Sequence, residues 1–364
     1  MGIERIVPQW EETKERFRAW WAGTAIRRPL IRMVARKPGY SAPVPKRPTD
    51  PQSFHVDLDF RFSRYQSYIS NHDFLADSFP NTTINMGAGS MALYLGSEPT
   101  FDFNTVWFNK TIGDWNDAPS IQYLQNNGWW RTHVDLIRAM TERAQGSFPI
   151  AIPDIIENMD ILASLRGTEE LCIDLMDQPL EIRKRLAQLD NAYIRFYDVM
   201  YDIVKMEDES SCFTSFQIWG PGKVVKIQCD FSAMLSPELF AELVVPSLAI
   251  QCGYTDYSLY HLDGPDAIRH VDSLMSISAL NALQWTAGAG QPDGGCDRWY
   301  GIYDKVRSAG KSLHISIYDG NADQMFDSAD RIINRYGRDG IYFLFPEMDG
   351  QTAGDFLARA GARW

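Results

Sequence analysis

The sequence predicts a single α/β domain, residues 1–364, folded as one (β/α)8 TIM barrel. Eight short apolar runs stand along the chain, and patterns typical of helices lie between many of them. Most of the runs are continuously apolar rather than alternating, as in strands that are buried on both faces. Strands that alternate with helices predict a parallel sheet, and eight of them predict closure into a barrel.

The predicted strands follow in chain order at residues 29–35, 82–86, 148–153, 212–219, 258–262, 280–285, 313–318 and 341–345. Helices are predicted at residues 168–176, 179–205, 237–252, 299–308 and 322–336. Ser236 is the predicted N-cap of the third of these helices, with Pro237 at its first position. Residues 1–28 form a predicted N-terminal helical extension. Residues 87–145 are too long for one crossover and predict an insertion after the second strand.

Composition and charge exclude some classes of function. The net charge of −12 opposes non-specific binding of nucleic acid, which needs clustered Lys and Arg. No apolar stretch of about 18 residues predicts a membrane span, and the first ten residues lack the apolar region of a secretory signal. The five cysteines are scattered without a C-x-x-C pair, so we expect a reduced, cytoplasmic protein.

The expected architecture directs attention to the carboxyl ends of the strands, where barrels of this kind carry their active sites. Polar and aromatic residues gather at these ends. Six of them are predicted to bind substrate: Arg36, Asp154, Trp219, Gln284, Trp285 and Tyr318. The tryptophans suit the wall of a ligand cleft, although each is more often a core residue.

His261 and Asp263 are the predicted catalytic pair. They lie two residues apart on one strand, so their side chains share a face of the sheet. The alternative is a buried histidine that pairs with a neighbouring carboxylate and holds a loop.

Several motifs together resemble the uroporphyrinogen decarboxylase superfamily. They are Gln228-Cys229-Asp230-Phe231, Leu235-Ser236-Pro237-Glu238-Leu239-Phe240, Val245-Pro246, His261-Leu262-Asp263-Gly264 and, upstream, Asp77-Ser78-Phe79-Pro80 with Gly87-Ala88-Gly89. The resemblance extends from about residue 30 to the C-terminus. It implies one barrel with either of two chemistries, cofactor-free decarboxylation or methyl transfer to a corrinoid.

The resemblance also implies site residues. Methyltransferases of the superfamily hold zinc with the His and Cys of a His-x-Cys element and a later Cys. Here Asp263 replaces the first Cys, and Glu347 lies in the region of the second. His261, Asp263 and Glu347 are therefore the expected ligands of zinc or another divalent metal, which would polarise a leaving group as a Lewis acid. Asp77 matches a position where a carboxylate contacts the substrate, or it caps a turn before Pro80.

We therefore expect a methyltransferase that moves a methyl group from a small O- or N-methylated compound to a corrinoid carried by a partner protein. One alternative is a cofactor-independent decarboxylase or lyase, in which Asp77 acts with Arg32 or Arg36. The Arg-Gln-Ala-Gly-Arg motif of the decarboxylases is absent here. The other alternative is a non-catalytic ligand-binding barrel. No G-x-S-x-G, H-E-x-x-H or P-loop motif points elsewhere.

Overall fold

A mostly parallel sheet organises the computed structural model, which describes residues 2–39 and 42–364. Within these residues the main sheet has the strand order β12-β1-β11-β10-β9-β8-β7, and β2 pairs with the other side of β1. Each neighbouring pair along this order is parallel, whereas β2 runs antiparallel to β1.

The strands are β1 (Leu30–Arg36), β2 (His72–Ala76), β3 (Pro99–Phe101), β4 (Val106–Phe108), β5 (Ser211–Phe213), β6 (Ile218–Gly220), β7 (Val224–Ile227), β8 (Tyr257–Asp263), β9 (Ala282–Thr286), β10 (Ser312–Ser316), β11 (Ile341–Leu344) and β12 (Met348–Asp349). The α-helices are α1 (Trp10–Trp21), α2 (Pro51–Val56), α3 (Leu58–Asn71), α4 (Met91–Tyr94), α5 (Gly128–Ala144), α6 (Asn158–Arg166), α7 (Thr168–Asp177), α8 (Pro179–Val204), α9 (Pro237–Leu239), α10 (Val245–Tyr254), α11 (Val271–Met275), α12 (Tyr300–Ser308), α13 (Ala322–Tyr336) and α14 (Gly350–Arg363). Short helical turns are η1 (Ile3–Arg5), η2 (Asp230–Met234), η3 (Phe240–Val244), η4 (Pro265–His270) and η5 (Asp297–Trp299).

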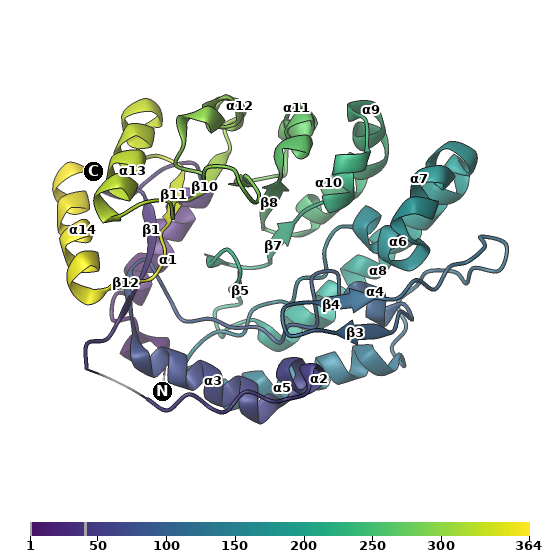
Figure 1. Ribbon diagram of the computed structural model, residues 1–364, viewed down its shortest axis with the longest axis horizontal. Coiled ribbons are helices and arrows are strands. Elements are labelled where there is room, and N and C mark those ends of the chain that lie inside the picture. Colours follow the sequence, from purple (N-terminus) through teal and green to yellow (C-terminus); the bar gives the residue numbers. More distant parts are fainter. Residues whose placement is uncertain (1, 40–41) are drawn as a thin grey trace.

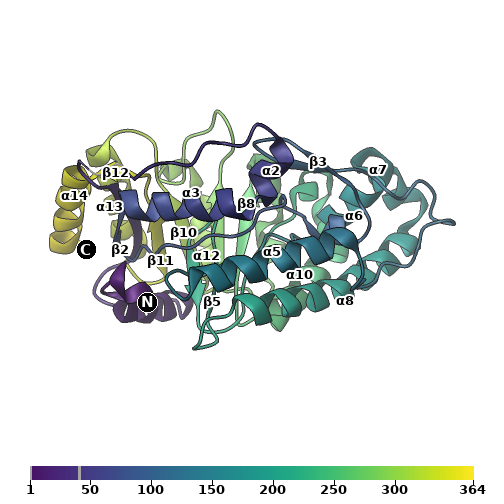
Figure 2. The ribbon, with the colours of Figure 1, turned by 90° about the horizontal axis from the view of Figure 1, so that it is seen from below.

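One row of helices packs against the outer side of the sheet. Other helices lie on the opposite side of the molecule. Figure 1 shows α10 to α14 as an outer row along the sheet, with the C-terminus at one end of that row. Helices α3 and α5 lie on the opposite side. Seen from below in Figure 2, α3, α5 and α8 run side by side across the molecule. We call the side of the sheet turned away from the outer row its inner face.

Alternation along the strands sorts side chains between the two faces. Leu262 of β8 pairs in register with Trp285 of β9, and both are buried in the cluster formed with the outer helices. Leu259 and Ala282 are also register partners, but they belong to a second buried cluster on the inner face. Because side chains in a strand alternate, each strand serves both cores.

The N-terminal helix closes the amino-terminal edge of the sheet. Trp20 of α1 donates its indole N–H to the carbonyl of Leu313 at 3.2 Å, and its own carbonyl accepts from Ser312 Oγ at 2.6 Å. Both partners stand where β10 begins. Phe17 packs edge-on against Tyr342 at 5.7 Å between ring centroids. The carboxyl-terminal edge is therefore the edge of the sheet that α1 leaves uncovered.

Five predicted strands are confirmed, at β1 and at β8 to β11. The prediction was wrong for residues 212–219, which form the antiparallel hairpin of β5 and β6. Residues 82–86 and 148–153 form no strand and meet only at the bridge between Thr82 and Ile150. The parallel strand next to β8 is instead β7. These segments lie between β2 and β7, where no continuous pairing of described strands joins the two ends of the sheet.

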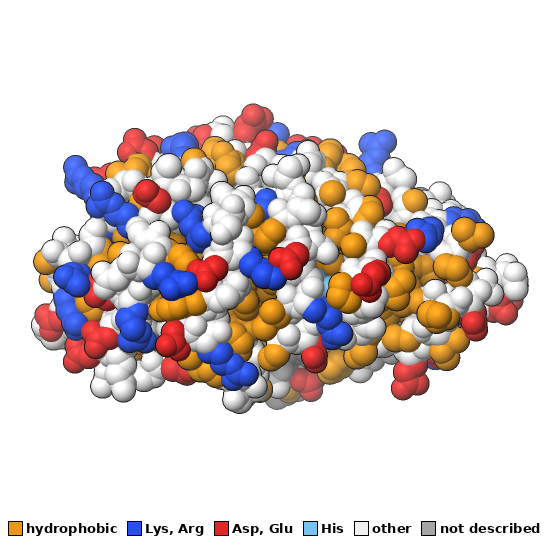
Figure 3. Space-filling view, turned by 90° about the horizontal axis from the view of Figure 1, so that it is seen from above, with side chains coloured by type: hydrophobic (Ala, Val, Ile, Leu, Met, Phe, Trp, Pro, Cys, Tyr) orange, Lys and Arg blue, Asp and Glu red, His pale blue; other side chains and the backbone are white. Residues whose placement is uncertain are grey.

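The predicted insertion at residues 87–145 contains α4, the two-stranded ribbon of β3 and β4, and α5. Residues 2–28 contain η1 and α1. No helix among the described residues is long and apolar enough to cross a membrane. The face seen from above in Figure 3 mixes Lys and Arg with Asp and Glu, and hydrophobic side chains gather towards the end where α7 lies.

Asp77 joins the N-terminal helix to the sheet. Its side chain has no exposed surface. The two carboxylate oxygens accept from Arg28 at 2.5 and 3.1 Å, from Arg16 of α1 at 3.1 Å and from the Ile31 N–H at 2.8 Å. β2 runs antiparallel to β1, so the residue after it returns to the amino-terminal edge. The carboxylate therefore bridges α1, β1 and β2 away from the carboxyl-terminal edge.

We predict that Asp77→Asn lowers the free energy of unfolding by about 3 kcal/mol, because it leaves two largely buried guanidinium groups without their anion. Urea unfolding followed by circular dichroism measures the loss. Asp59→Asn is the control, since Asp59 is 83% exposed and pairs with Arg143 on the surface. Wild-type stability for Asp77→Asn would contradict this structural role.

Candidate functional site

Polar side chains form a layer on the inner face of the sheet. His261 of β8 is the register partner of Gln284 of β9, which in turn partners His314 of β10 and, beyond it, Tyr342 of β11. Partners in parallel strands point to the same side, so all four share the inner face. Asp263, two residues beyond His261, shares this face nearer the carboxyl-terminal edge.

Gln284 fixes the tautomer of His261. The amide nitrogen of Gln284 donates to the carbonyl of Trp285 at 2.8 Å, and this acceptor requires a nitrogen at that position. The amide oxygen therefore faces His261 Nδ1, at 2.5 Å. Nδ1 must carry the proton, which leaves the lone pair on Nε2. Nε2 lies 4.0 Å from Asp263 Oδ2, beyond hydrogen-bond distance.

Burial and the neighbouring ammonium of Lys226 lower the pKa of His261 below its ordinary value of 6.5, and the hydrogen bond that His261 donates to Gln284 opposes this decrease. At neutral pH the imidazole is uncharged. A neutral ring with a fixed tautomer is suited to accept a proton, accept a hydrogen bond or coordinate a metal through Nε2.

Lys226 and Asp154 form a buried ion pair beside this histidine. Lys226 lies on β7 in register with Leu259, so it faces inward, and its Nζ is 2.5 Å from Asp154 Oδ2. The lysine is 3% exposed. Its ammonium also donates to Gln228 Oε1, and Gln228 Nε2 donates to Asp230 Oδ2 at 2.9 Å. A connected polar network thus runs from Asp154 to Asp230.

Two carboxyl groups complete this network. Burial raises the pKa of Asp230, and the nearby His261 and Lys226 oppose the increase. Burial also raises the pKa of Asp263. Burial therefore favours the protonated form of both carboxyl groups more than in an exposed aspartic acid. We refer to Asp154, Lys226, Asp230, His261, Asp263 and Gln284 as the C-terminal-edge site.

A cleft of about 690 Å³ adjoins the site. Asp230 and Asp160 lie on its wall, together with the aromatic rings of Trp107, Phe108 and Phe231. Trp107 belongs to the ribbon of β3 and β4 and is 64% exposed. Asp230 belongs to both the cleft and the C-terminal-edge site, so it connects the aromatic surface to the polar network.

Glu347 lies outside the metal set that the sequence predicts. Its carboxylate binds Arg36 at 3.1 Å and His72 at 2.9 Å, beside the last residue of β1. Among the described residues, the ligand atoms of three His, Cys, Asp or Glu side chains come within 4.8 Å of one another only at Glu157, Asp160 and Cys229. The predicted trio fails because β9, β10 and β11 separate β8 from β1. Arg36 is exposed and, through Glu347, part of a surface ion pair.

The two predicted tryptophans do not line a ligand site in this structure. Trp219 lies in β6 with no exposed surface, packed edge-on against Trp10 at 5.8 Å and accepting from the Trp21 indole at 2.8 Å. Trp285 is 1% exposed and faces the outer helices, where it meets Trp299 at 5.0 Å between centroids. Both are core residues.

Asp77 also departs from its predicted catalytic role, because its carboxylate is buried at the amino-terminal edge and saturated by two arginines. Tyr318 does stand beyond the end of β10, 52% exposed. Its backbone N–H donates to Asp293 Oδ2 at 2.5 Å, and burial followed by Asp293, Asp319 and Asp263 raises the pKa of its phenol. Asp263 therefore lies within electrostatic range of Tyr318.

No protein-family model matches the chain, and a search of curated proteins found no relative.

Lys226 and Asp230 are two residues of the site that were not predicted from the sequence. The sequence did offer one indication of Lys226, because it is a lysine inside the apolar run of β7. A charged side chain that is buried there needs a partner of opposite charge. Asp230 was read only as part of a family motif. Glu157, Asp160 and Cys229 come together from two distant segments, which no spacing rule could reveal.

We predict that His261 titrates below pH 6.5 and carries its proton on Nδ1 at pH 7. Two-bond nitrogen–proton NMR spectra of ring-labelled histidine report both properties, and His261→Gln assigns the signal. Lys226→Met should raise the pKa of His261, because it removes the positive charge that opposes protonation.

Lys223→Met is the matched control. Lys223 is held by Asp198 at 2.7 Å and Tyr254 at 2.9 Å. An Nε2–H tautomer in the wild type, or equal shifts in both variants, would contradict the electrostatic account of the site.

Proposed function

We propose that the protein is an enzyme that moves a methyl group from a small O- or N-methylated compound to a corrinoid carried by a partner protein. We further propose that its curved sheet is that of a (β/α)8 barrel of the uroporphyrinogen decarboxylase type. The resemblance of the motifs supports the reaction class. The arrangement of the C-terminal-edge site supports its location.

The single observation that carries the proposal is the fixed tautomer of His261. The free Nε2 of His261 lies 4.0 Å from Asp263 on the side that α1 leaves uncovered, whereas the unpartnered ring nitrogens of His270 and His314 are buried. Gln284 in turn is anchored by the Trp285 carbonyl. Such support of a side chain by its neighbours is typical of groups that contact a reacting molecule.

The proton-transfer requirement of the reaction fits the two carboxyl groups. When a methyl group is transferred, the oxygen or nitrogen that held it keeps the bonding electron pair and needs a proton. Asp263 and Asp230 have raised pKa values and supply candidate protons. His261 Nε2 accepts a hydrogen bond and orients the donor molecule. The aromatic rings of the cleft suit the apolar part of such a donor.

The metal set expected from the resemblance does not fit these residues, because Glu347 binds Arg36 and His72 instead. The proposed mechanism therefore assigns activation of the leaving group to a proton from Asp263 or Asp230. No step of it passes through a metal bound by His261, Asp263 and Glu347.

We predict that purified protein methylates free cob(I)alamin with at least one donor among methoxybenzoates and methylamines. His261→Ala and Asp263→Asn should each slow the reaction by about 100-fold or more, since the first removes the group that orients the donor and the second removes a group that supplies the proton. The absorbance of the cobalamin reports turnover. Asp266→Asn, 82% exposed and three residues beyond Asp263, should retain wild-type rates.

Wild-type rates in both His261→Ala and Asp263→Asn would contradict the assigned site. Tight binding of a donor without any turnover, with the corrinoid supplied, would instead identify a non-catalytic ligand-binding barrel.

One observation favours decarboxylation as a second candidate. A cavity of about 330 Å³ is lined by Arg61 and Arg64 together with Tyr65, Tyr68 and Asn81. Arg61 forms no ion pair among the described residues, and burial with the like charge of Arg64 lowers its pKa to about 10. A substrate carboxylate would relieve both effects. Under the decarboxylase hypothesis, Arg61 and Arg64 would bind the substrate carboxylate in place of Arg32 and Arg36. Asp77 would take no part in the reaction.

Under decarboxylation, carbon dioxide is released from a small carboxylate without corrinoid, and the rate survives chelation of metals. Arg61→Met should then raise the KM for the carboxylate about tenfold or more, since it removes a charge-assisted hydrogen bond. Arg138→Met serves as the control, because Arg138 is 51% exposed and lies on α5. An unchanged KM in Arg61→Met would remove this cavity from consideration.

A further inference from the structure

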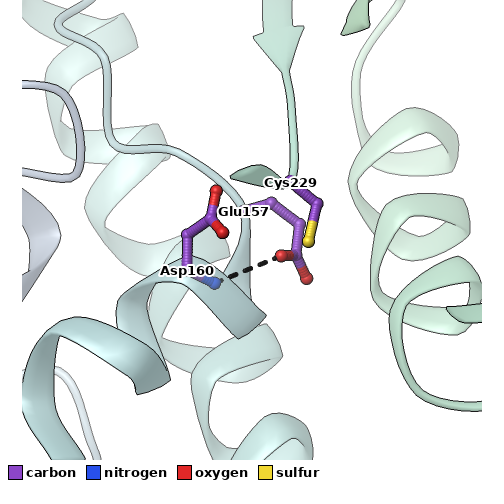
Figure 4. A group of neighbouring side chains, drawn as sticks. All are labelled: Glu157, Asp160 and Cys229. Carbon is purple, nitrogen blue, oxygen red and sulfur yellow. Dashed lines mark hydrogen bonds between the residues drawn. The ribbon is translucent and has the colours of Figure 1, made fainter. Parts of the chain in front are cut away.

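Glu157, Asp160 and Cys229 form a buried cluster behind the C-terminal-edge site. Glu157 is the N-cap of α6, Asp160 lies in the first turn of that helix, and Cys229 stands between β7 and η2. Figure 4 shows Glu157 and Asp160 on one segment and Cys229 on the other, with the Glu157 carboxyl group beside the Cys229 sulfur. One potential ligand atom from each lies within 4.8 Å of the other two. The cluster thus combines two carboxylates with one thiol.

Within ion-pair distance the carboxylates of this cluster have no described cationic partner, although the more distant ammonium of Lys226 lowers the pKa of Asp160. Glu157 has no exposed surface, Cys229 is 4% exposed and Asp160 is 8% exposed. Neither carboxylate forms an ion pair with a described Lys or Arg within 4.0 Å. Buried ionised groups need a counter-charge, or they take up a proton.

One oxygen of Glu157 is unused. Its Oε2 caps α6 by accepting from the Met159 N–H at 2.8 Å. Its Oε1 is buried and has no hydrogen-bond partner among the described residues outside the cluster, where the Cys229 thiol is the one side-chain donor that lowers the pKa of this carboxyl group. Buried polar atoms are nearly always satisfied, so an isolated carboxylate oxygen beside a thiol points to a missing partner. Asp160, by contrast, accepts from the Asp230 and Phe231 N–H groups, both at 2.8 Å.

Burial and the neighbouring acidic groups raise the pKa values of all three side chains. Burial raises the pKa of Glu157, and Asp160 adds to the increase. Burial followed by Asp230 raises the pKa of Asp160. Burial, Asp160 and Glu157 together raise the pKa of the Cys229 thiol. A cation at their centre would reverse all three effects, because it favours the ionised form of each ligand.

We propose that Glu157, Asp160 and Cys229 bind one divalent transition-metal ion, with zinc the best match to a donor set of one thiolate and two carboxylate oxygens. Tetrahedral zinc places its ligand atoms about 3.5 Å apart, and the three ligand atoms here lie within 4.8 Å of one another. This site shares no residue with the trio that the sequence predicts, and it does not depend on the proposed methyl transfer.

The ion can reach this site from solvent. Asp160 lies on the wall of the 690 Å³ cleft, so one ligand is accessible while the other two are enclosed. Three protein ligands leave a fourth position for water or a ligand. Since Asp160 also holds the backbone of η2, the ion links α6 to the segment that carries Asp230.

Titration of chelator-treated protein with Co²⁺ tests the proposal, because a thiolate ligand gives Co²⁺ an intense near-ultraviolet charge-transfer band. We expect one equivalent of Co²⁺ to produce this band and zinc to displace it. Cys229→Ser should abolish the band. Glu157→Gln should weaken binding at least about 100-fold while its amide oxygen still caps α6.

Two control variants make the result specific. Cys212→Ser changes a cysteine that is equally buried but lies outside the cluster, and the band should persist in it. His261→Ala should also retain the band, which separates this site from the C-terminal-edge site. Circular dichroism of each variant without metal establishes that it is folded.

The proposal is overturned if wild-type protein takes up no Co²⁺ or zinc, in which case the cluster is held by protons alone. It is also overturned if folded Cys229→Ser keeps the charge-transfer band, or if His261→Ala loses it. None of these readouts uses methyl transfer, so inactivity towards methylated donors leaves the result unaffected.

Discussion

The carboxylate of Asp77 is the interaction on which the arrangement of this protein most depends. It accepts from two arginines and one backbone N–H, and it thereby joins α1, β1 and the end of β2. With α1 held there, tryptophan and phenylalanine rings fill the inner face at the amino-terminal edge. Polar side chains farther along the same strands consequently gather near the opposite edge. The aromatic cluster at the amino-terminal edge and the polar site at the carboxyl-terminal edge both follow from one parallel sheet, of which α1 covers only the amino-terminal edge.

Much of the sheet could be predicted from the sequence because β1 and β8 to β11 are short apolar runs buried on both faces. The prediction failed between β2 and β7. Residues 82–86 and 148–153 have the composition of strands, but they pair only through one bridge and the bond from the Ile152 N–H to the Cys212 carbonyl. Hydrophobic patterns report burial, whereas strand pairing also depends on partners that are distant in sequence.

The candidate site was predictable as a location rather than as a set of residues. His261, Asp263, Gln284 and Asp154 do meet near the carboxyl-terminal edge, because parallel strands align their ends. Gln284 and Trp285 were both assigned to the site, although adjacent strand residues face opposite sides. Glu347 was placed by resemblance alone, and the sequence could not reveal its distance from His261. Lys226, a charged residue in an apolar strand, has a larger effect on the pKa of His261 than any other residue.

The proposed role of His261 requires a neutral, accessible Nε2, and chemical labelling of the histidines tests this most directly. Each of the other five histidines is buried, with at most 7% of its surface exposed. Limited treatment with diethyl pyrocarbonate at pH 7, followed by peptide mass spectrometry, should therefore acylate His261 first, and donor binding should fall in proportion. Preferential labelling of another histidine, or undiminished binding after His261 is fully acylated, would contradict the central claim.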